Sequence, residues 1–104
     1  MSEDIVVVAS IPAKDGDVDG LLAAFQSAVP AVHAEDGCLR YAPHRGEDAV
    51  WVIEHWASPA ALEAHGKGDA MAAVGKAIGA YVGGRPTIHR LAPAPAGDAD
   101  KGSV

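Results

Sequence analysis

Three side chains that could do acid–base chemistry or hold an aromatic ring lie close together in the sequence: Glu54, Trp56 and His65. Glu54 and Trp56 end an apolar run, and His65 lies nine residues after Trp56. A strand that only filled a core would have no use for a carboxylate there, because an unpaired buried charge is costly. Histidine has an unperturbed pKa of about 6.5 and can remove a proton near neutral pH. The stretch therefore predicts an apolar cleft with an aromatic wall and one titratable group.

Each of these residues also has a structural interpretation. Trp56 could be a core aromatic residue that closes the sheet, and His65 could be a helix-terminal residue favoured by the helix dipole. Glu54 could orient a hydrogen-bond donor, or it could pair with Arg40 or Arg90 on neighbouring strands. The residue types leave both interpretations open.

Two tyrosines and a second histidine near this stretch are weaker candidates. Tyr41 and Tyr81 could either pack in the core or donate a hydroxyl into the cleft. His55 alternates with Glu54 and Trp56, so it points to the opposite face of the strand. Burial in an interface explains that position better than catalysis does.

The elements that must position these residues follow the order β-α-β-β-α-β. Runs rich in β-branched residues predict four strands, over residues 5–11, 38–45, 49–56 and 87–91. The short reversal at residues 46–48 makes the middle two strands an antiparallel hairpin. Apolar spacings of three and four predict helices over residues 18–32 and 59–81, the second interrupted by glycines. The order predicts a ferredoxin-like α+β fold, with an antiparallel sheet and its helices on one face.

Local signals mark where the helices start and stop. Asp17 is the expected N-cap of the first helix and Gly37 its expected stop. Pro30 lies inside this helical pattern and predicts a kink or a break there. Ser58 followed by Pro59 is a strong start for the second helical region.

Both faces of the predicted sheet are largely apolar. In the third strand, Trp51, Ile53 and His55 point away from the face that carries Glu54 and Trp56. Two helices can cover only one face, so the other would be a large exposed apolar patch. The pattern predicts a homodimer, sheet against sheet, through Trp51, Ile53 and His55.

Length and composition bound the remaining possibilities. The 104 residues predict one domain over residues 1–92, and a tail over 93–104 rich in Pro, Ala, Gly and Asp is expected to be disordered. The net charge is −6, with no basic cluster, which argues against nucleic acid and anionic membranes as partners. The chain has no apolar run near the roughly 20 residues of a membrane span. With Cys38 as its single cysteine, it is expected to be a cytoplasmic protein.

Several kinds of site lack support in the sequence. The Gly83-Gly84-Arg85-Pro86 segment has neither the spacing of a phosphate-binding loop nor a helix after it. The five histidines form no pair four residues apart, and no second cysteine lies nearby, which disfavours a metal site. Phosphoryl transfer and dinucleotide redox chemistry therefore have no basis in the residues.

Three motifs, in order and at this spacing, resemble the antibiotic biosynthesis monooxygenase family, especially its small bacterial quinol monooxygenases. They are EDGCLRYAP (residues 35–43), VIEHW (52–56) and ALEAH (61–65), and the resemblance covers roughly residues 4–92. It implies a dimeric α/β barrel made of two ferredoxin-like subunits. It also implies oxygenation of a quinol, an anthrone or a related electron-rich aromatic with O₂, using no metal, flavin or haem cofactor.

The resemblance assigns roles residue by residue. Trp56 and His65 match the family's pocket tryptophan and histidine, and are the expected catalytic residues. Tyr41, Arg40 and Glu54 match weaker positions of the pocket. The helical pattern makes Tyr81 a further weak candidate for the pocket.

Related folds leave three alternatives. Haem-degrading relatives use an asparagine in the first strand where this chain has Ala9, which disfavours haem degradation. Other relatives isomerise small ketones or lactones, and a phosphorylated substrate would depend on Arg40, Arg85 or Arg90. The third alternative is a protein that binds an aromatic ligand without converting it.

Overall fold

A computed structural model describes residues 3–104, so the first two residues of the predicted domain lie outside the described part. The elements are β1 (Ile5–Pro12), the short 3₁₀ helix η1 (Lys14–Gly16), α1 (Val18–His33), β2 (Cys38–Arg45), β3 (Ala49–Trp56), α2 (Pro59–Gly66), α3 (Asp69–Ile78) and β4 (Thr87–Leu91). The predicted order of strands and helices is confirmed, and the glycine-interrupted helical region forms the two helices α2 and α3. The protein has the ferredoxin-like α+β fold.

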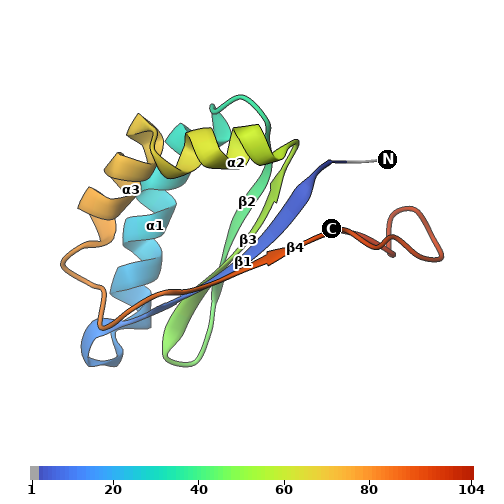
Figure 1. Cartoon of the computed structure of the whole chain (residues 1–104). Helices are drawn as coiled ribbons and strands as arrows, with labels where there is room; N and C mark the ends of the chain where they lie inside the picture. Colours follow the sequence, from blue (N-terminus) through green and yellow to red (C-terminus); the bar gives the residue numbers. More distant parts are fainter. Residues whose placement is uncertain (1–2) are drawn as a thin grey trace.

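The four strands form one antiparallel sheet in the order β2-β3-β1-β4. Figure 1 shows α1, α2 and α3 on one side of this sheet, with no element on the other side. The strand β3 is central: Glu54 lies opposite Val7 of β1 and opposite Tyr41 of β2. Residues from three strands therefore meet beneath the helices.

The alternation predicted for β3 is confirmed by burial. Val50, Val52, Glu54 and Trp56 are all at most 6% exposed, whereas Trp51 is 42% exposed. The face toward the helices, here called the inner face, packs against Leu21, Phe25 and Val32 of α1 and Val74 and Ile78 of α3. On the opposite, outer face, which no helix of residues 3–104 covers, Trp51 and Leu91 are 42% and 49% exposed.

The helix starts are as predicted, but the first helix ends differently. Asp17 accepts a hydrogen bond from the Gly20 amide at 2.9 Å. The Ser58 hydroxyl accepts one from the Ala61 amide at 3.1 Å, which fixes the start of α2. These two caps set the entry of the chain into α1 and α2.

The predicted break at Pro30 is wrong, since α1 runs through it as one helix to His33. Pro30 lies in the last turn, so the helix loses a single hydrogen bond near its exposed end. The predicted stop at Gly37 is also wrong, because the helix ends at His33 and Ala34 is its C-cap. Gly37 instead lies in the following turn at φ 81°, a backbone conformation that suits glycine.

The last residues form no helix or strand after Leu91. Figure 1 shows this segment running away from the sheet and closing a small loop. In the loop, Asp98 accepts hydrogen bonds from the amides of Asp100 and Lys101 at 2.8 and 3.0 Å. The disorder expected for residues 93–104 stays a prediction. None of the helices in residues 3–104 combines the length and apolar character needed to cross a bilayer.

Candidate functional site

A cavity of about 530 Å³ lies between the inner face of the sheet and the helices α2 and α3. Its floor comes from β1, β2 and β3, and one side from β4. The apolar lining is formed by Val7, Ala9, Ile11, Phe25, Val52, Pro59, Leu62, Met71, Val74, Ile78, Pro86 and Ile88. The polar groups are fewer and are contributed by Tyr41, Glu54, Glu63, His65 and Arg90. Such a cavity suits a flat apolar ligand with a few polar atoms.

His65 joins this cavity to the core behind it. It lies in the last turn of α2 and is 5% exposed. Its ring packs on the indole of Trp56, with ring centroids 4.4 Å apart and an interplanar angle of 31°. The predicted approach of the imidazole to the indole is therefore present. Since α2 has only eight residues after the Ser58 cap, the helix brings His65 back over the end of the preceding strand, β3.

Trp56 lies behind His65 and does not line the cavity. Its side chain is fully buried, at 0% exposure, and its Nε1–H donates a hydrogen bond to Oε1 of Glu54 at 3.0 Å. Trp56 thus supports both His65, by ring contact, and Glu54, by hydrogen bonding. It is a supporting residue of the site and not part of the cavity lining.

Glu54 brings a carboxyl group to the cavity floor and is 6% exposed. Burial raises its pKa above the ordinary 4.5, and the Trp56 hydrogen bond and the nearby His65 oppose this rise. No Lys or Arg forms an ion pair with it within residues 3–104, so the pairing considered with Arg40 or Arg90 is absent there. Glu54 is a buried carboxyl group that can accept or donate a hydrogen bond.

Tyr41 faces the same space from β2 and is 4% exposed. Its ring centroid lies 5.7 Å from that of His65. Burial raises the pKa of the Tyr41 hydroxyl well above 10.0, and the Glu54 carboxylate adds to the rise. Tyr41 therefore stays protonated at neutral pH and can donate a hydrogen bond into the cavity.

The structure adds a carboxylate that sequence reasoning missed. Glu35, in the turn between α1 and β2, places Oε1 2.6 Å from Nδ1 of His65. Glu35 belongs to the first of the three motifs, but it lies 30 residues before His65 in the chain. Only a prediction that the turn after α1 folds onto α2 would have brought the two together.

Two of the predicted site residues lie elsewhere. Arg40 is exposed and alternates with the inward-facing Tyr41, so it lies on the outer face. Tyr81 is 38% exposed and does not line the cavity, because α3 ends at Ile78 and the chain turns away. The backbone of Tyr81 instead accepts a hydrogen bond from the Lys14 amide at 2.8 Å.

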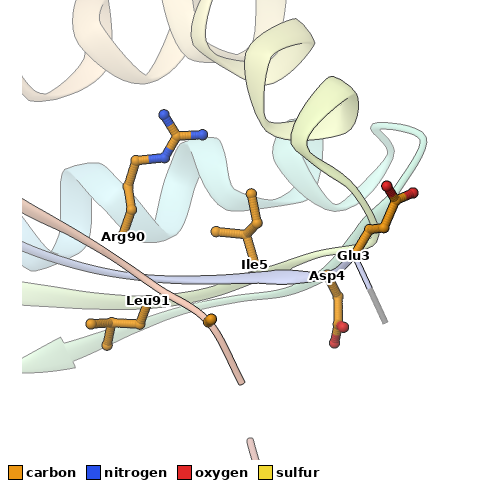
Figure 2. Close-up of a pocket in the computed structure, with 6 residues that line it drawn as sticks. Glu3, Asp4, Ile5, Arg90 and Leu91 are labelled. Atoms are coloured by element: carbon orange, nitrogen blue, oxygen red, sulfur yellow. The ribbon is translucent and has the colours of Figure 1, made fainter. Parts of the chain in front are cut away.

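Arg90 of β4 stands at the border between this cavity and a shallower hollow. The hollow is lined by Glu3, Asp4, Ile5, Arg90, Leu91 and Ala92. Figure 2 shows Arg90 and Ile5 pointing toward the helices, whereas Leu91 and Asp4 point to the other side of the sheet. Among the described residues that line the main cavity, Arg90 contributes the sole Lys or Arg side chain. No three His, Cys, Asp or Glu side chains within residues 3–104 are placed to hold a metal ion.

Comparisons with known proteins identify the family. The family model for antibiotic biosynthesis monooxygenases matches residues 4–77, which include Glu35, Tyr41, Glu54, Trp56 and His65. The chain belongs to the antibiotic biosynthesis monooxygenase family. The resemblance seen in the three motifs is thereby confirmed.

Solved structures agree with this assignment to the antibiotic biosynthesis monooxygenase family. A Caulobacter crescentus protein, provisionally named an antibiotic biosynthesis monooxygenase, is 32% identical, with a TM-score of 0.76 over 86% of this chain and 89% of that one. A Pseudomonas aeruginosa protein is 28% identical, with a TM-score of 0.74 over 88% and 94% of the two chains. A Shewanella oneidensis protein is 26% identical, with a TM-score of 0.74 over 88% and 91%. Among curated proteins, none matches the chain.

Proposed function

We propose that the protein is a monooxygenase that oxidises a quinol, an anthrone or a related electron-rich aromatic with O₂ and needs no bound cofactor. The observation that carries this proposal is His65, which lines an apolar cavity and is held by Trp56 behind it and Glu35 beside it. The family assignment agrees with a monooxygenase, and the cavity supports the finer proposal about the substrate.

The proposed reaction needs a base that deprotonates the substrate and needs no external reductant. His65 removes the acidic proton of the phenol or of the anthrone methylene, and the resulting anion gives an electron to O₂. In an anthrone the CH₂ becomes C=O; in a quinol a ring C–H becomes C–OH and the ring becomes a quinone. In each case one oxygen atom enters the product and the other leaves as water. The substrate supplies all four electrons, so the atoms and electrons balance without another reductant.

The other groups in the cavity orient the substrate. A flat aromatic ring fits among Val52, Leu62 and Val74, where burial keeps water away from the reactive anion. Tyr41 can donate a hydrogen bond to a substrate oxygen, and Glu54 can accept one from a substrate hydroxyl. Holding the substrate in one orientation beside the base accounts for part of the rate.

An isomerase is the second candidate, because His65 and Glu54 place two proton-transfer groups at one cavity. A phosphorylated substrate has little support, since Arg40 lies on the outer face, Arg85 is exposed in a loop, and Arg90 alone reaches the cavity. Haem degradation also has little support, because Ala9, at the first-strand position where haem-degrading relatives have an asparagine, lines the cavity and offers no side-chain amide.

Oxygen uptake by the purified protein tests the proposal directly. The panel contains dihydroquinones and anthrones, with a chelator present, flavin and nicotinamide omitted, and spontaneous oxidation subtracted. We expect protein-dependent uptake of one O₂ molecule for each molecule of product formed. Ligand binding without uptake would favour a non-catalytic binding protein. Product formation under strict anaerobiosis would favour the isomerase.

A further inference from the structure

Glu35 contacts His65 from outside the cavity. Its Oε1 lies 2.6 Å from Nδ1 of His65, and the two side chains are 19% and 6% exposed. Glu35 does not line the cavity, so it cannot touch a ligand bound there. Any effect that it has on a bound molecule must act through His65.

The turn that carries Glu35 is held tightly against the helix that carries His65. The Ala57 amide donates to the Gly37 carbonyl at 2.8 Å, and the Cys38 amide donates to the Glu35 carbonyl at 3.2 Å. A side chain at Gly37 would have no room, because its Cβ would lie 2.5 Å from Cβ of Ala61 in α2. The Glu35 carboxylate is therefore placed by the backbone of its turn as well as by its contact with His65.

The chemistry of this contact fixes where the imidazole carries its proton. An ionised carboxylate can only accept hydrogen bonds, so Nδ1 of His65 must be the donor. A neutral imidazole with its proton on Nδ1 has a lone pair on Nε2. Within residues 3–104, Nε2 has no hydrogen-bond partner and is not sealed from solvent, while His65 itself lines the cavity.

We propose that Glu35 is a positioning residue that holds His65 in the tautomer protonated on Nδ1, so that Nε2 presents its lone pair to the cavity. The consequence for catalysis rests on the proposed oxygenase function, whereas the tautomer does not. Once His65 has taken a proton on Nε2, the Glu35 carboxylate faces an imidazolium and stabilises that charge. Packing of the imidazole ring of His65 on Trp56 also limits rotation of that ring about its bond to Cβ.

Nitrogen-15 NMR of the full-length protein, near pH 8, tests the tautomer first. We expect Nδ1 of His65 to carry the proton in the wild-type protein. In Glu35→Gln the amide can donate as well as accept, so the ring should show a mixture of tautomers or the reverse one. The matched control is Asp36→Asn, which removes the same charge from the exposed neighbouring position and should leave the wild-type signal.

Kinetics with the most active substrate of the oxygen panel forms the second arm. Glu35→Gln should lower kcat about 10- to 100-fold, the range typical for loss of the carboxylate that orients a metal-bound histidine. KM should change less than about threefold, because Glu35 does not line the cavity. Asp36→Asn should retain the wild-type kcat.

The outcomes separate this proposal from the proposed function. A wild-type His65 protonated on Nε2 would overturn the role of Glu35, whether or not the protein consumes oxygen. An unchanged tautomer and kcat in Glu35→Gln would overturn it as well. The expected tautomer and its loss in Glu35→Gln would support the positioning role even in a protein inactive on the whole panel, and only the oxygenase would then be rejected.

Discussion

A histidine paired with a carboxylate lies on each side of the sheet. On the inner face, Nδ1 of His65 lies 2.6 Å from Glu35, and on the outer face Nε2 of His55 lies 2.5 Å from Asp4. Both pairs are largely buried, with the histidine side chains 6% and 16% exposed. The residue types alone do not distinguish them.

The surroundings of the two histidine–carboxylate pairs distinguish them. His65 borders a cavity of about 530 Å³ and packs on Trp56. It also lies near the ring of Tyr41 and the carboxyl group of Glu54. His55 is absent from the lining of that cavity and shares the uncovered face with Trp51 and Ile53. A histidine–carboxylate pair is a candidate site where it borders a space for a ligand, so we propose a chemical role for the inner pair and a structural role for the outer pair.

The sharpest test of this difference replaces each histidine by alanine. His65→Ala should lower kcat on the active substrate about 10²- to 10⁴-fold, because it removes the proposed general base. His55→Ala should keep kcat within about threefold, because it leaves the cavity intact. Steady-state oxygen uptake at saturating substrate measures both variants. Equal losses of kcat in the two variants would show that the two histidines do not differ in role.

The outer face gives the next largest effect, on assembly. We propose that a second copy of the chain covers this face, since Trp51 and Leu91 are 42% and 49% exposed on it and the helices lie on the other side. Trp51→Glu should raise the dimer dissociation constant at least about 100-fold, because burying an unpaired carboxylate costs several kcal/mol. Light scattering over a dilution series measures this change.

A matched variant lies on the other side of the molecule. Met71 of α3 is 37% exposed and lines the cavity mouth, so Met71→Glu adds the same charge at similar exposure. It should leave the dimer intact. A wild-type protein that is monomeric at all concentrations, or a Trp51→Glu variant that dimerises normally, would contradict the proposed interface.

Much of this arrangement could be read from the sequence, because it depends on local patterns. The period of two along β3 separated Glu54 and Trp56 from Trp51 and His55 correctly, and Ser58 marked the start of the helix that carries His65. Such signals depend on neighbours in the chain and survive without knowledge of the tertiary structure.

The site residues that the sequence misses or misplaces have different causes. Glu35 reaches His65 only because the turn after α1 packs on α2, which no spacing along the chain reveals. The helical spacing groups Tyr81 with Val74 and Ile78, but α3 ends at Ile78, three residues before Tyr81. The family motif suggests Arg40 for the pocket, but Arg40 lies on the outer face, because strand alternation turns it away from Tyr41.

The two tryptophans offer a smaller contrast, in stability. Trp56→Phe removes the donor that bonds Glu54 at 3.0 Å and leaves a buried carboxyl oxygen without its partner. The free energy of unfolding should fall by about 1–3 kcal/mol. Trp51→Phe, on the outer face, removes no hydrogen bond within residues 3–104 and should cost less than about 1 kcal/mol. Denaturant unfolding at fixed protein concentration measures both; equal costs would mean that the Trp56–Glu54 bond adds nothing.

The smallest expected effect is the pH dependence that the buried Glu54 gives to stability. Its pKa in the folded protein is raised above 4.5 by burial, so in the pH range between the two values the folded state binds more protons than the unfolded state. The contribution of Glu54 to stability is then fully present below pH 4.5 and is lost as the pH rises through the folded-state pKa. Glu54→Gln keeps an oxygen that can accept from Trp56 but cannot ionise. The stability of wild type minus that of Glu54→Gln should therefore decline as the pH rises from 4 to 8.

Glu47→Gln, at the exposed hairpin turn, serves as the charge-matched control and should show no such decline. A difference that rises with pH would require a cation beside Glu54 that favours its ionised form, and the inner face would then be a polar site rather than the apolar one described for it.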